Sequence, residues 1–204
     1  MKSRPYTQQV RADRSGETHR RILDAHIALV AQRGALHVPL ADIAAKADVT
    51  VQTVLRHFGS ADALRARTRD YAAELVRLER AVPVGDVTAA VRAVVAQYEA
   101  RADAMLVVLA HEATDATARS VTTAARAAHR EWIERVFAGA VRGRAAAARE
   151  EIVDLLVVAT DLQTWRLLRR ENGLSRQDTE ERMLRLARAV LADAAADVDG
   201  HGAG

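Results

Sequence analysis

One stretch of the sequence, residues 39–58, constrains the fold more than any other part of the chain. Its apolar residues recur at helical spacing on both sides of a short polar turn at Asp48. Pro39 suits the first turn of a helix, and Thr50 can cap a second one because its hydroxyl accepts a hydrogen bond from a backbone amide. Asp48 tolerates the left-handed backbone that such a turn needs better than most residues. The stretch predicts two short helices joined as a helix-turn-helix.

The second of these helices has an outward face suited to the major groove of DNA. With Val49, Val54 and Phe58 turned inward, the outer face holds the side chains of Val51, Gln52, Thr53, Leu55 and Arg56. Glutamine can bond adenine, arginine can bond guanine, and valine or leucine can contact the methyl group of thymine. Thr50, Thr53 and His57 could contact phosphates. Alternatively, Val51 and Leu55 pack on a neighbouring helix and His57 is a packing residue.

The rest of the chain is also composed for helices. Alanine, leucine and valine dominate, aromatic residues make up 3%, and the 204 residues contain three prolines. Such a composition favours helices over strands, so we predict an all-α protein. We expect helices over residues 17–33, 61–81, 86–101, 104–113, 117–138, 145–171 and 175–196. We expect disorder in residues 1–16 and in the tail from residue 199.

Positive charge is concentrated at the N-terminal end. Residues 1–60 carry nine Lys and Arg against five Asp and Glu, whereas the remaining residues carry 21 against 22. A basic end on a near-neutral body indicates an anionic partner for that end. Arg4, Arg11 and Arg14 would form a basic arm, or merely a solvated tail. Arg20 and Arg21 add to the same charge.

Several classes of function have no support in the sequence. The chain has no cysteine, which excludes disulfides, thiolate metal sites and cysteine nucleophiles. His111-Glu112 is not followed by the second histidine of a zinc protease motif, and no glycine-rich phosphate loop is present. We therefore expect no enzyme activity, no metal and no cofactor. No apolar run approaches a membrane span, and no signal peptide is visible, so we expect a cytoplasmic protein without a membrane partner.

Many positions between residues 18 and 64 agree with one known pattern. They are Arg20-x-Ile22-Leu23, Gly34, Asp42-Ile43-Ala44, Ala47-x-Val49-Thr50, Thr53-Val54-x-x-His57-Phe58-x-Ser60 and Leu64. In this order and spacing they resemble the TetR family of transcriptional regulators. Further along, Thr160-Asp161-x-x-Thr164-Trp165-Arg166 and the sequence up to Ser175 are similar to the penultimate helix of many members.

The resemblance implies a homodimer that binds double-stranded DNA at a palindromic operator and responds to a small-molecule inducer. It implies an N-terminal three-helix helix-turn-helix domain over residues 1–64. A C-terminal helical ligand-binding and dimerisation domain would follow over residues 65–204, with its last two helices pairing with the partner. The apolar stripes of those helices could instead only complete the core of the subunit.

This sequence departs from the family pattern at positions that touch DNA. The family usually has glycine at the positions of Asp48 and Gln52, tyrosine at that of Leu55 and lysine at that of Ala61. Leucine cannot reach a phosphate as the tyrosine hydroxyl does, so this surface loses salt-dependent affinity. The basic arm with Arg20 and Arg21 could compensate. The alternative is a helical ligand-binding or interaction protein whose DNA binding is weakened or lost.

Candidate ligand contacts are the polar and aromatic residues expected inside the C-terminal helices. A ligand pocket is apolar with a few polar groups, and such groups are scarce in this chain. The candidates are Tyr98, Met105, His111, His129, Trp132, Asp161 and Trp165. For each of them, an ordinary core or surface role is the alternative.

Overall fold

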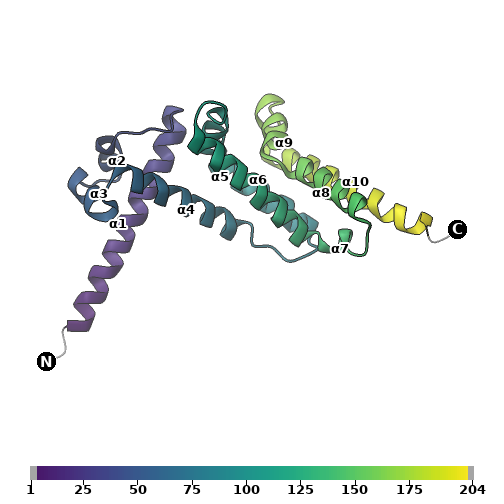
Figure 1. Cartoon of the computed structure of the whole chain (residues 1–204), viewed down its shortest axis with the longest axis horizontal. Coiled ribbons are helices and arrows are strands. Elements are labelled where there is room, and N and C mark those ends of the chain that lie inside the picture. The colour runs from purple at the N-terminus through teal and green to yellow at the C-terminus, as the bar shows by residue number, and fades with distance from the viewer. Residues whose placement is uncertain (1–3, 202–204) are drawn as a thin grey trace. The chain divides into compact units, whose positions relative to one another are not determined.

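The computed structural model describes the backbone of residues 4–201 and the side chains of residues 14–196. These residues form helices and loops, without a strand (Figure 1). They divide into two compact units, one of residues up to 75 together with 103–121, the other of 76–102 together with the residues from 122 onward. The predicted all-α fold is confirmed.

The first unit contains the helix-turn-helix. Its helices are α1 (Arg4–Arg33), α2 (Leu40–Lys46), α3 (Val51–Phe58) and α4, which begins at Ala61 and runs to Glu79 (Figure 1). One apolar cluster holds them together, with buried side chains that include Ile22, Ile43, Val54, Phe58 and Leu64. Each of these four helices contributes to that cluster, which explains why helices as short as α2 and α3 are stable here: tertiary packing supplies what their length cannot.

Local chemistry sets the ends of α3. Asp48 adopts a φ of 52°, the left-handed backbone expected for the turn. Thr50 caps α3, since its hydroxyl accepts a hydrogen bond from the amide of Thr53 at 3.1 Å. Gly59, at a φ of 81°, ends the helix, and Ser60 then caps α4 through the amide of Ala63. The signals predicted for Asp48 and Thr50 are confirmed, whereas Pro39 stands at the N-cap of α2 rather than inside its first turn.

The prediction of disorder before residue 17 was wrong from residue 4 onward. Helix α1 begins at Arg4 and includes Gly16. Pro5 lies in the first turn, where its missing amide is tolerated, and no further breaker precedes Gly16, which costs a helix about 1 kcal/mol relative to alanine. The side chains of Arg4 and Arg11 lie outside the described residues. From residue 4 onward, the predicted basic arm is thus the first part of helix α1, the same helix that packs against α2 and α3.

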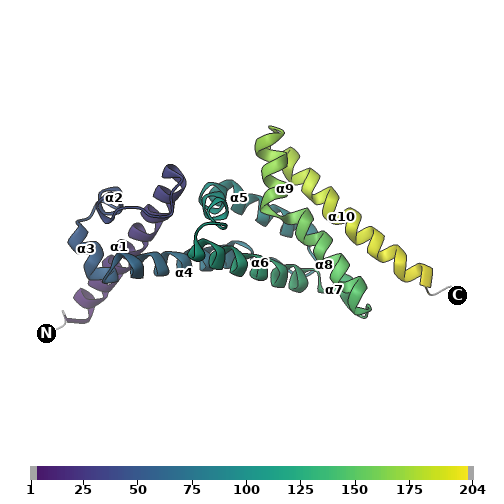
Figure 2. The ribbon, with the colours of Figure 1, turned by 45° about the horizontal axis from the view of Figure 1, so that its top comes forward.

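The second unit contains most of the remaining helices. They are α5 (Val87–Ala110, whose residues from 103 on belong to the first unit), α6 (Ala116–Val136, whose residues up to 121 belong to the first unit), α7 (Ala138–Val141), α8 (Ala146–Thr160), α9 (Leu162–Arg166), the π-helix η1 (Leu167–Glu171) and α10 (Arg176–His201). Helices α8 and α10 pack side by side along their length (Figure 2). The core is built around Trp165, Tyr98, Ile133, Leu156 and Met183, all of which are fully buried.

Three helix predictions in this part of the chain need correction. The helices expected over residues 86–101 and 104–113 are one helix, α5, because Ala102-Asp103-Ala104 contains no breaker. The helix expected over 145–171 is interrupted at Asp161, whose side chain accepts from the amide of Gln163 at 2.7 Å and starts α9 afresh. Helix α10 continues to His201, beyond the expected end at residue 196. The last residues, 202–204, lie outside the described residues.

The turn after α9 is unusually wide. In η1, the amide of Asn172 bonds the carbonyl of Leu167, five residues back, at 2.9 Å. Two side chains of α9 and η1 meet one acid: Trp165 Nε1 and Arg169 Nε lie 3.2 Å and 2.8 Å from Glu99 Oε1. Ser175 then caps α10, since its hydroxyl accepts from the amide of Asp178.

Candidate nucleic-acid interface

Helix α3 is held so that one face is buried and the other is open. Val54 and Phe58 are buried, and Val49, just before the helix, packs against the same cluster. Thr50 and Thr53 share a hydrogen bond between their hydroxyl groups, 3.0 Å apart, at the start of the helix. The two hydroxyl groups therefore take part in the N-cap of α3, and they also lie at the edge of its open face.

The outward row predicted for α3 is exposed in the structure. Val51 and Leu55 retain 37% and 39% of their surface, and Gln52 and Arg56 are exposed as well. The alternative in which Val51 and Leu55 are packed away therefore does not describe this helix. Two apolar and two hydrogen-bonding side chains stand four residues apart, in two parallel rows. Such a face can meet both thymine methyl groups and base-edge acceptors or donors.

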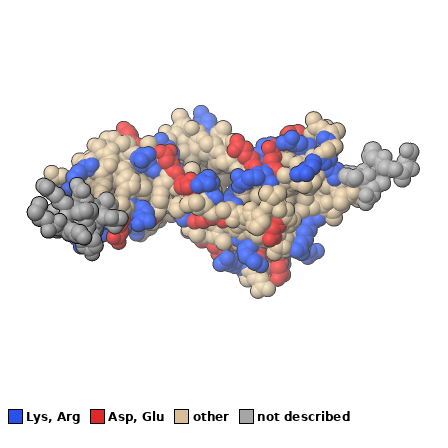
Figure 3. Space-filling view, turned by 90° about the horizontal axis from the view of Figure 1, so that it is seen from below, with Lys and Arg blue, Asp and Glu red and all other residues tan. Residues whose placement is uncertain are grey.

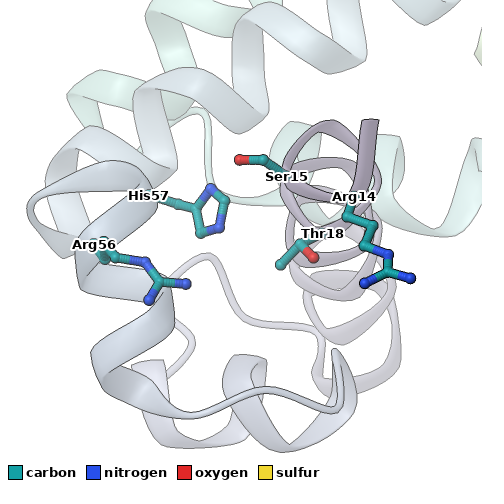
Figure 4. A pocket seen from close by; sticks show the side chains of 5 residues that line it. All are labelled: Arg14, Ser15, Thr18, Arg56 and His57. Atoms are coloured by element: carbon teal, nitrogen blue, oxygen red, sulfur yellow. The ribbon is translucent and has the colours of Figure 1, made fainter. Parts of the chain in front are cut away.

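A hollow of about 530 Å³ opens between α1 and α3. It is lined by Arg14, Ser15, Thr18, Arg56 and His57 (Figure 4). In the close-up the first three come from α1, the last two come from α3, and all five surround the same space. Two guanidinium groups, two hydroxyl groups and an imidazole offer donors to an anion such as a phosphate. Arg14, Arg56 and His57 were predicted from the sequence, whereas Ser15 and Thr18 were not.

Aromatic rings of α1 and α3 contact one another, and one of them, that of His57, lines this hollow. The ring of His19 lies 4.4 Å from that of Phe58 and 6.0 Å from that of His57. Burial, followed by the charges of His57 and Arg67, lowers the pKa of His19. His19 is thus neutral near pH 7 and acts as a packing partner for α3. Sequence spacing gave no signal for it, because the contact joins two helices.

The two arginines of α1 that were predicted to bind DNA differ in their surroundings. Arg20 is exposed. Arg21 instead points to the turn between α2 and α3, where it donates to the carbonyl oxygens of Ala47 and Asp48. Its guanidinium also lies 3.8 Å from the carboxylate of Asp48. Arg21 is therefore engaged within the protein, in a position that steadies the turn.

Charges of both signs mix over the face shown in Figure 3, where blue and red side chains lie next to one another. This agrees with the near balance of acids and bases after residue 60. Within the second unit, Arg130 pairs with Glu150 and with Asp154. No group of three or more His, Asp or Glu side chains that could hold a metal ion lies among the described residues. Nor does any described helix meet the length and hydropathy of a membrane span.

The residues predicted to bind a ligand fall into two groups. Tyr98, His129, Trp132 and Trp165 are buried in the second unit. Their rings form two pairs, Tyr98 with Trp165 at 5.9 Å and His129 with Trp132 at 5.7 Å. Asp161 belongs to the same unit and caps α9.

Met105 and His111 belong to the first unit instead. The ring of His111 bonds the carbonyl of Val107 on its own helix. The structure therefore brings together five of the seven candidates within one unit and leaves these two apart.

A residue that the sequence analysis missed lies at the centre of the buried group. Arg80 is 6% exposed and donates to Gln97, His129 and Tyr98. The indole of Trp132 donates in turn to the carbonyl of Arg80 at 2.9 Å. Arg80 lies three residues before Pro83, where a helix is expected to end, so the sequence suggests an arginine exposed to solvent. Its burial depends on contacts with α5 and α6, which no local pattern reveals.

Comparison with known proteins agrees with the fold and with the N-terminal domain. Residues 22–68 match the family described as bacterial regulatory proteins, tetR family. The chain is also similar in structure to a crystal structure from Rhodococcus sp. assigned to the TetR family of transcriptional regulators, with a TM-score of 0.63 at 18% identity. The similarity covers 86% of this chain and 99% of the other. Because the two sequences are 18% identical, it shows that the folds are alike and nothing more. No curated protein sequence matches the chain.

The family match covers the whole helix-turn-helix, from Ile22 in α1 to Thr68 in α4. It includes the capped turn and the exposed row of α3 described above. The resemblance expected from the sequence is thus confirmed: residues 22–68 match the domain model of the family described as bacterial regulatory proteins, tetR family.

Proposed function

We propose that this protein is a ligand-responsive repressor that binds a palindromic operator as a homodimer in the cytoplasm. The observation that carries the proposal is the exposed row of α3 beside the hollow between α1 and α3. A helix with a buried anchor face, a capped N-terminus and an open polar and apolar face is what major-groove reading requires. Proteins of this family are generally not enzymes.

Within this proposal, the side chains of α3 divide into readers and positioners. Arg56 reads a guanine, Gln52 an adenine, and Val51 and Leu55 lie against thymine methyl groups. Thr50, Thr53, His57 and Arg20 contact phosphates. Phosphate contacts fix the register of the protein on DNA, whereas base contacts carry the sequence preference.

Donors that line the hollow between α1 and α3 could replace two residues that usually contact phosphates in this family. Leu55 and Ala61 offer no donor where tyrosine and lysine are usual. Arg14, Ser15 and Thr18 supply donors from α1 instead, next to Arg56 and His57. In this proposal the phosphate contacts have moved to the helix that continues the basic arm. Each contact of this kind steepens the salt dependence of binding.

The proposed dimer uses the faces of α8 and α10 that a single subunit leaves open. Leu155 and Val158 on α8 and Leu186 on α10 are exposed, whereas Leu156 and Met183 on the same helices are buried. Each helix therefore has one apolar side in the core of its own subunit and further apolar residues outside it. Exposed apolar side chains on two packed helices favour a self-complementary interface with a second copy.

A ligand would act in this proposal by favouring one conformation of the dimer over another. The two α3 helices of a dimer must match half-sites about 34–36 Å apart, one turn of DNA. A ligand that binds better to a conformation with another spacing shifts the population toward it and releases the operator. The buried group around Tyr98, His129 and Trp132 is the proposed site of that ligand.

The deciding experiment measures binding of the full-length protein to the DNA upstream of its own coding region, from low to physiological salt. We expect one saturable complex at a palindrome, with a steep salt dependence. The double variant Gln52→Ala/Arg56→Ala should lose the preference for that site while keeping its fold. Absence of binding to any palindrome at low salt would favour the second candidate, a helical ligand-binding or interaction protein. The unusual Leu55 and Ala61 are what keep that candidate open.

A further inference from the structure

Arg80 is a buried cation whose contacts are all to neutral groups. Its Nε donates to Gln97 Oε1 at 2.5 Å, its Nη1 to His129 Nδ1 at 2.5 Å and its Nη2 to the Tyr98 hydroxyl at 3.1 Å. The guanidinium carbon lies 5.2 Å from the ring centre of Trp132 and 5.7 Å from that of Tyr98. An arginine side chain stays protonated in proteins, so the charge is present at every working pH.

The imidazole of His129 cannot balance this charge. Its Nδ1 must accept from Arg80, which leaves Nε2 to donate to the hydroxyl of Thr160 at 3.1 Å. That hydroxyl donates onward to the carbonyl of Leu156 at 2.8 Å. Burial, followed by the charge of Arg80, lowers the pKa of His129 to about 3. His129 is therefore a neutral acceptor.

The hydroxyl of Tyr98 does not balance it either. It accepts from Arg80 and donates to the carbonyl of Thr160 at 3.0 Å, which needs the proton to be in place. Burial is the largest influence on Tyr98 and raises its pKa to about 12. At neutral pH the group beside Arg80 is thus a phenol, not a phenolate.

Other arginines of the same unit form ion pairs with carboxylates. Arg101 binds both carboxylate oxygens of Glu79, at 2.6–3.0 Å, and Arg169 binds Glu99. Both of these pairs are only partly buried. Arg80 is more deeply buried than either, yet no described Asp or Glu side chain contacts it. The charge of Asp161 acts on the Tyr98 hydroxyl, but Asp161 makes no ion pair with Arg80. Three of its five N–H donors have acceptors here, which leaves two available.

Burial of an uncompensated charge is unfavourable, so a site of this kind is stabilised by an anion that comes from outside. The planar fork of a guanidinium matches a carboxylate, which can take two parallel hydrogen bonds. The neighbouring aromatic faces of Trp132 and Tyr98 suit an apolar body attached to that carboxylate. A strongly hydrated inorganic anion would find few further donors among these groups.

We infer that Arg80 is the receptor for the carboxylate of a small organic anion, held between Gln97, His129 and the aromatic rings of Trp132 and Tyr98. This inference rests on the proposed ligand response and names the chemical class of the ligand. Because Arg80 is 6% exposed, the carboxylate reaches it only when neighbouring side chains move aside. Entry therefore exchanges neutral acceptors for a charged one and rearranges contacts of α5, α6 and α8 together.

The test uses three carboxylates, namely benzoate, phenylacetate and octanoate, each paired with its neutral amide. Trp132 and Trp165 are the two tryptophans of the chain, and Trp132 contacts Arg80 directly, so intrinsic fluorescence reports binding. For the full-length protein we expect at least one carboxylate to quench or shift this fluorescence and to raise the thermal midpoint. Its amide should bind at least tenfold more weakly. Arg80→Met should weaken binding of the carboxylate at least tenfold and leave that of the amide unchanged.

Arg101→Met is the matched control, since it removes a paired arginine from the same unit. It should lower the thermal midpoint of the free protein yet keep carboxylate binding, whereas Arg80→Met should be at least as stable as the wild type without ligand. Equal binding of acids and amides, or no response to any of the three acids, would overturn the inference. So would a loss of stability in Arg80→Met as large as that in Arg101→Met.

Operator binding measured in parallel separates this inference from the proposed function. A carboxylate that binds through Arg80 without releasing DNA supports the receptor and contradicts the ligand-responsive repressor. A neutral compound that releases DNA equally well from the wild type and from Arg80→Met supports the repressor and contradicts the receptor.

Discussion

The guanidinium of Arg21 in α1 lies 3.2 Å from the backbone carbonyl oxygen of Asp48 in the turn between α2 and α3. The same group donates to the carbonyl of Ala47. Asp48 is the one non-glycine residue with a positive φ among the described residues, a backbone conformation that is unfavourable for most side chains. Arg21 stabilises this turn, because it donates hydrogen bonds to two carbonyl oxygens that have no partner within a helix.

Arg21→Ala should therefore affect stability rather than phosphate binding. Loss of these charge-assisted hydrogen bonds at a partly exposed site should lower the free energy of unfolding by about 1–2 kcal/mol. The slope of log affinity against log salt should stay as in the wild type. Urea unfolding followed by circular dichroism, with a salt titration of DNA binding, measures both. A reduced slope with unchanged stability would return Arg21 to the phosphate contacts.

Arg56→Ala should weaken binding to the operator by about 1–3 kcal/mol and relax the preference at one base pair. The reason is the loss of a bidentate contact to a guanine. Binding to a set of operator variants, each changed at one position, would show it. Arg142→Ala, in the loop before α8, is the control and should bind like the wild type. An unchanged preference profile for Arg56→Ala would exclude it as a reader.

Arg14→Ala should act differently from Arg56→Ala, although both side chains line the same hollow. A phosphate contact carries no sequence information, so affinity should fall by a similar factor for every DNA sequence. The salt slope should decrease by about 1. A change in preference at one base pair, with the slope intact, would contradict the phosphate role.

The helix-turn-helix could be predicted almost completely because its determinants are local. Thr50, Asp48 and Gly59 act through their own backbone or that of the next turn, and such signals are visible in one sequence. Asp161 was read as part of a long helix because its side chain can either face solvent in a helix or cap a new one. The choice depends on packing between α8 and α9, which the sequence does not display.

The candidate site residues also divide into those with local determinants and those that depend on contacts between distant parts of the chain. Val51, Gln52, Leu55 and Arg56 were found because helical periodicity alone places them on one face. Arg80 escaped because its three acceptors lie 17 to 49 residues away in the sequence. Periodicity identified the aromatic residues around it but could not identify the cation that they enclose.

The proposed dimer can be tested by placing charge on the open faces of α8 and α10. Val158→Asp combined with Leu186→Asp should raise the dissociation constant of the dimer at least a hundredfold, since charges would be buried without partners in both subunits. The subunit should stay folded because Val158 and Leu186 are 62% and 46% exposed. Sedimentation velocity over a concentration series gives the constant. Leu78→Asp, at an exposed leucine of α4, is the control, and an unchanged dimer in the double variant would rule out this interface.

His26 should make the first unit sensitive to mild acid. Its Nδ1 lies 2.8 Å from the hydroxyl of Thr68, which itself donates to the carbonyl of Leu64, and its Nε2 is buried without a partner in the described structure. Burial, followed by the charge of Arg65, lowers the pKa of His26 to about 4. The unfolded chain thus takes up a proton near pH 6.5, but the folded protein does not. Stability is therefore full above pH 6.5 and falls as the pH drops toward 4.

The slope expected from one such group is about 1.4 kcal/mol per pH unit. His26→Gln should remove this contribution between pH 6.5 and 5, measured by urea unfolding at constant protein concentration. His37→Gln, at an exposed histidine, should keep it. Parallel pH profiles for the wild type and His26→Gln would contradict the buried neutral imidazole.

The wide turn of η1 determines what a change of length in this part of the chain would do. Asn172 bonds five residues back, to Leu167, where an ordinary helix would bond four back. The turn therefore holds one residue more than an ordinary helical turn. Trp165 and Arg169 are four residues apart, the spacing that places two side chains on the same side of a helix, and both reach Glu99. Deletion of one residue after Arg169 would let the chain close an ordinary turn and should leave the two contacts with Glu99 in place, so the extra residue is absorbed within η1 itself.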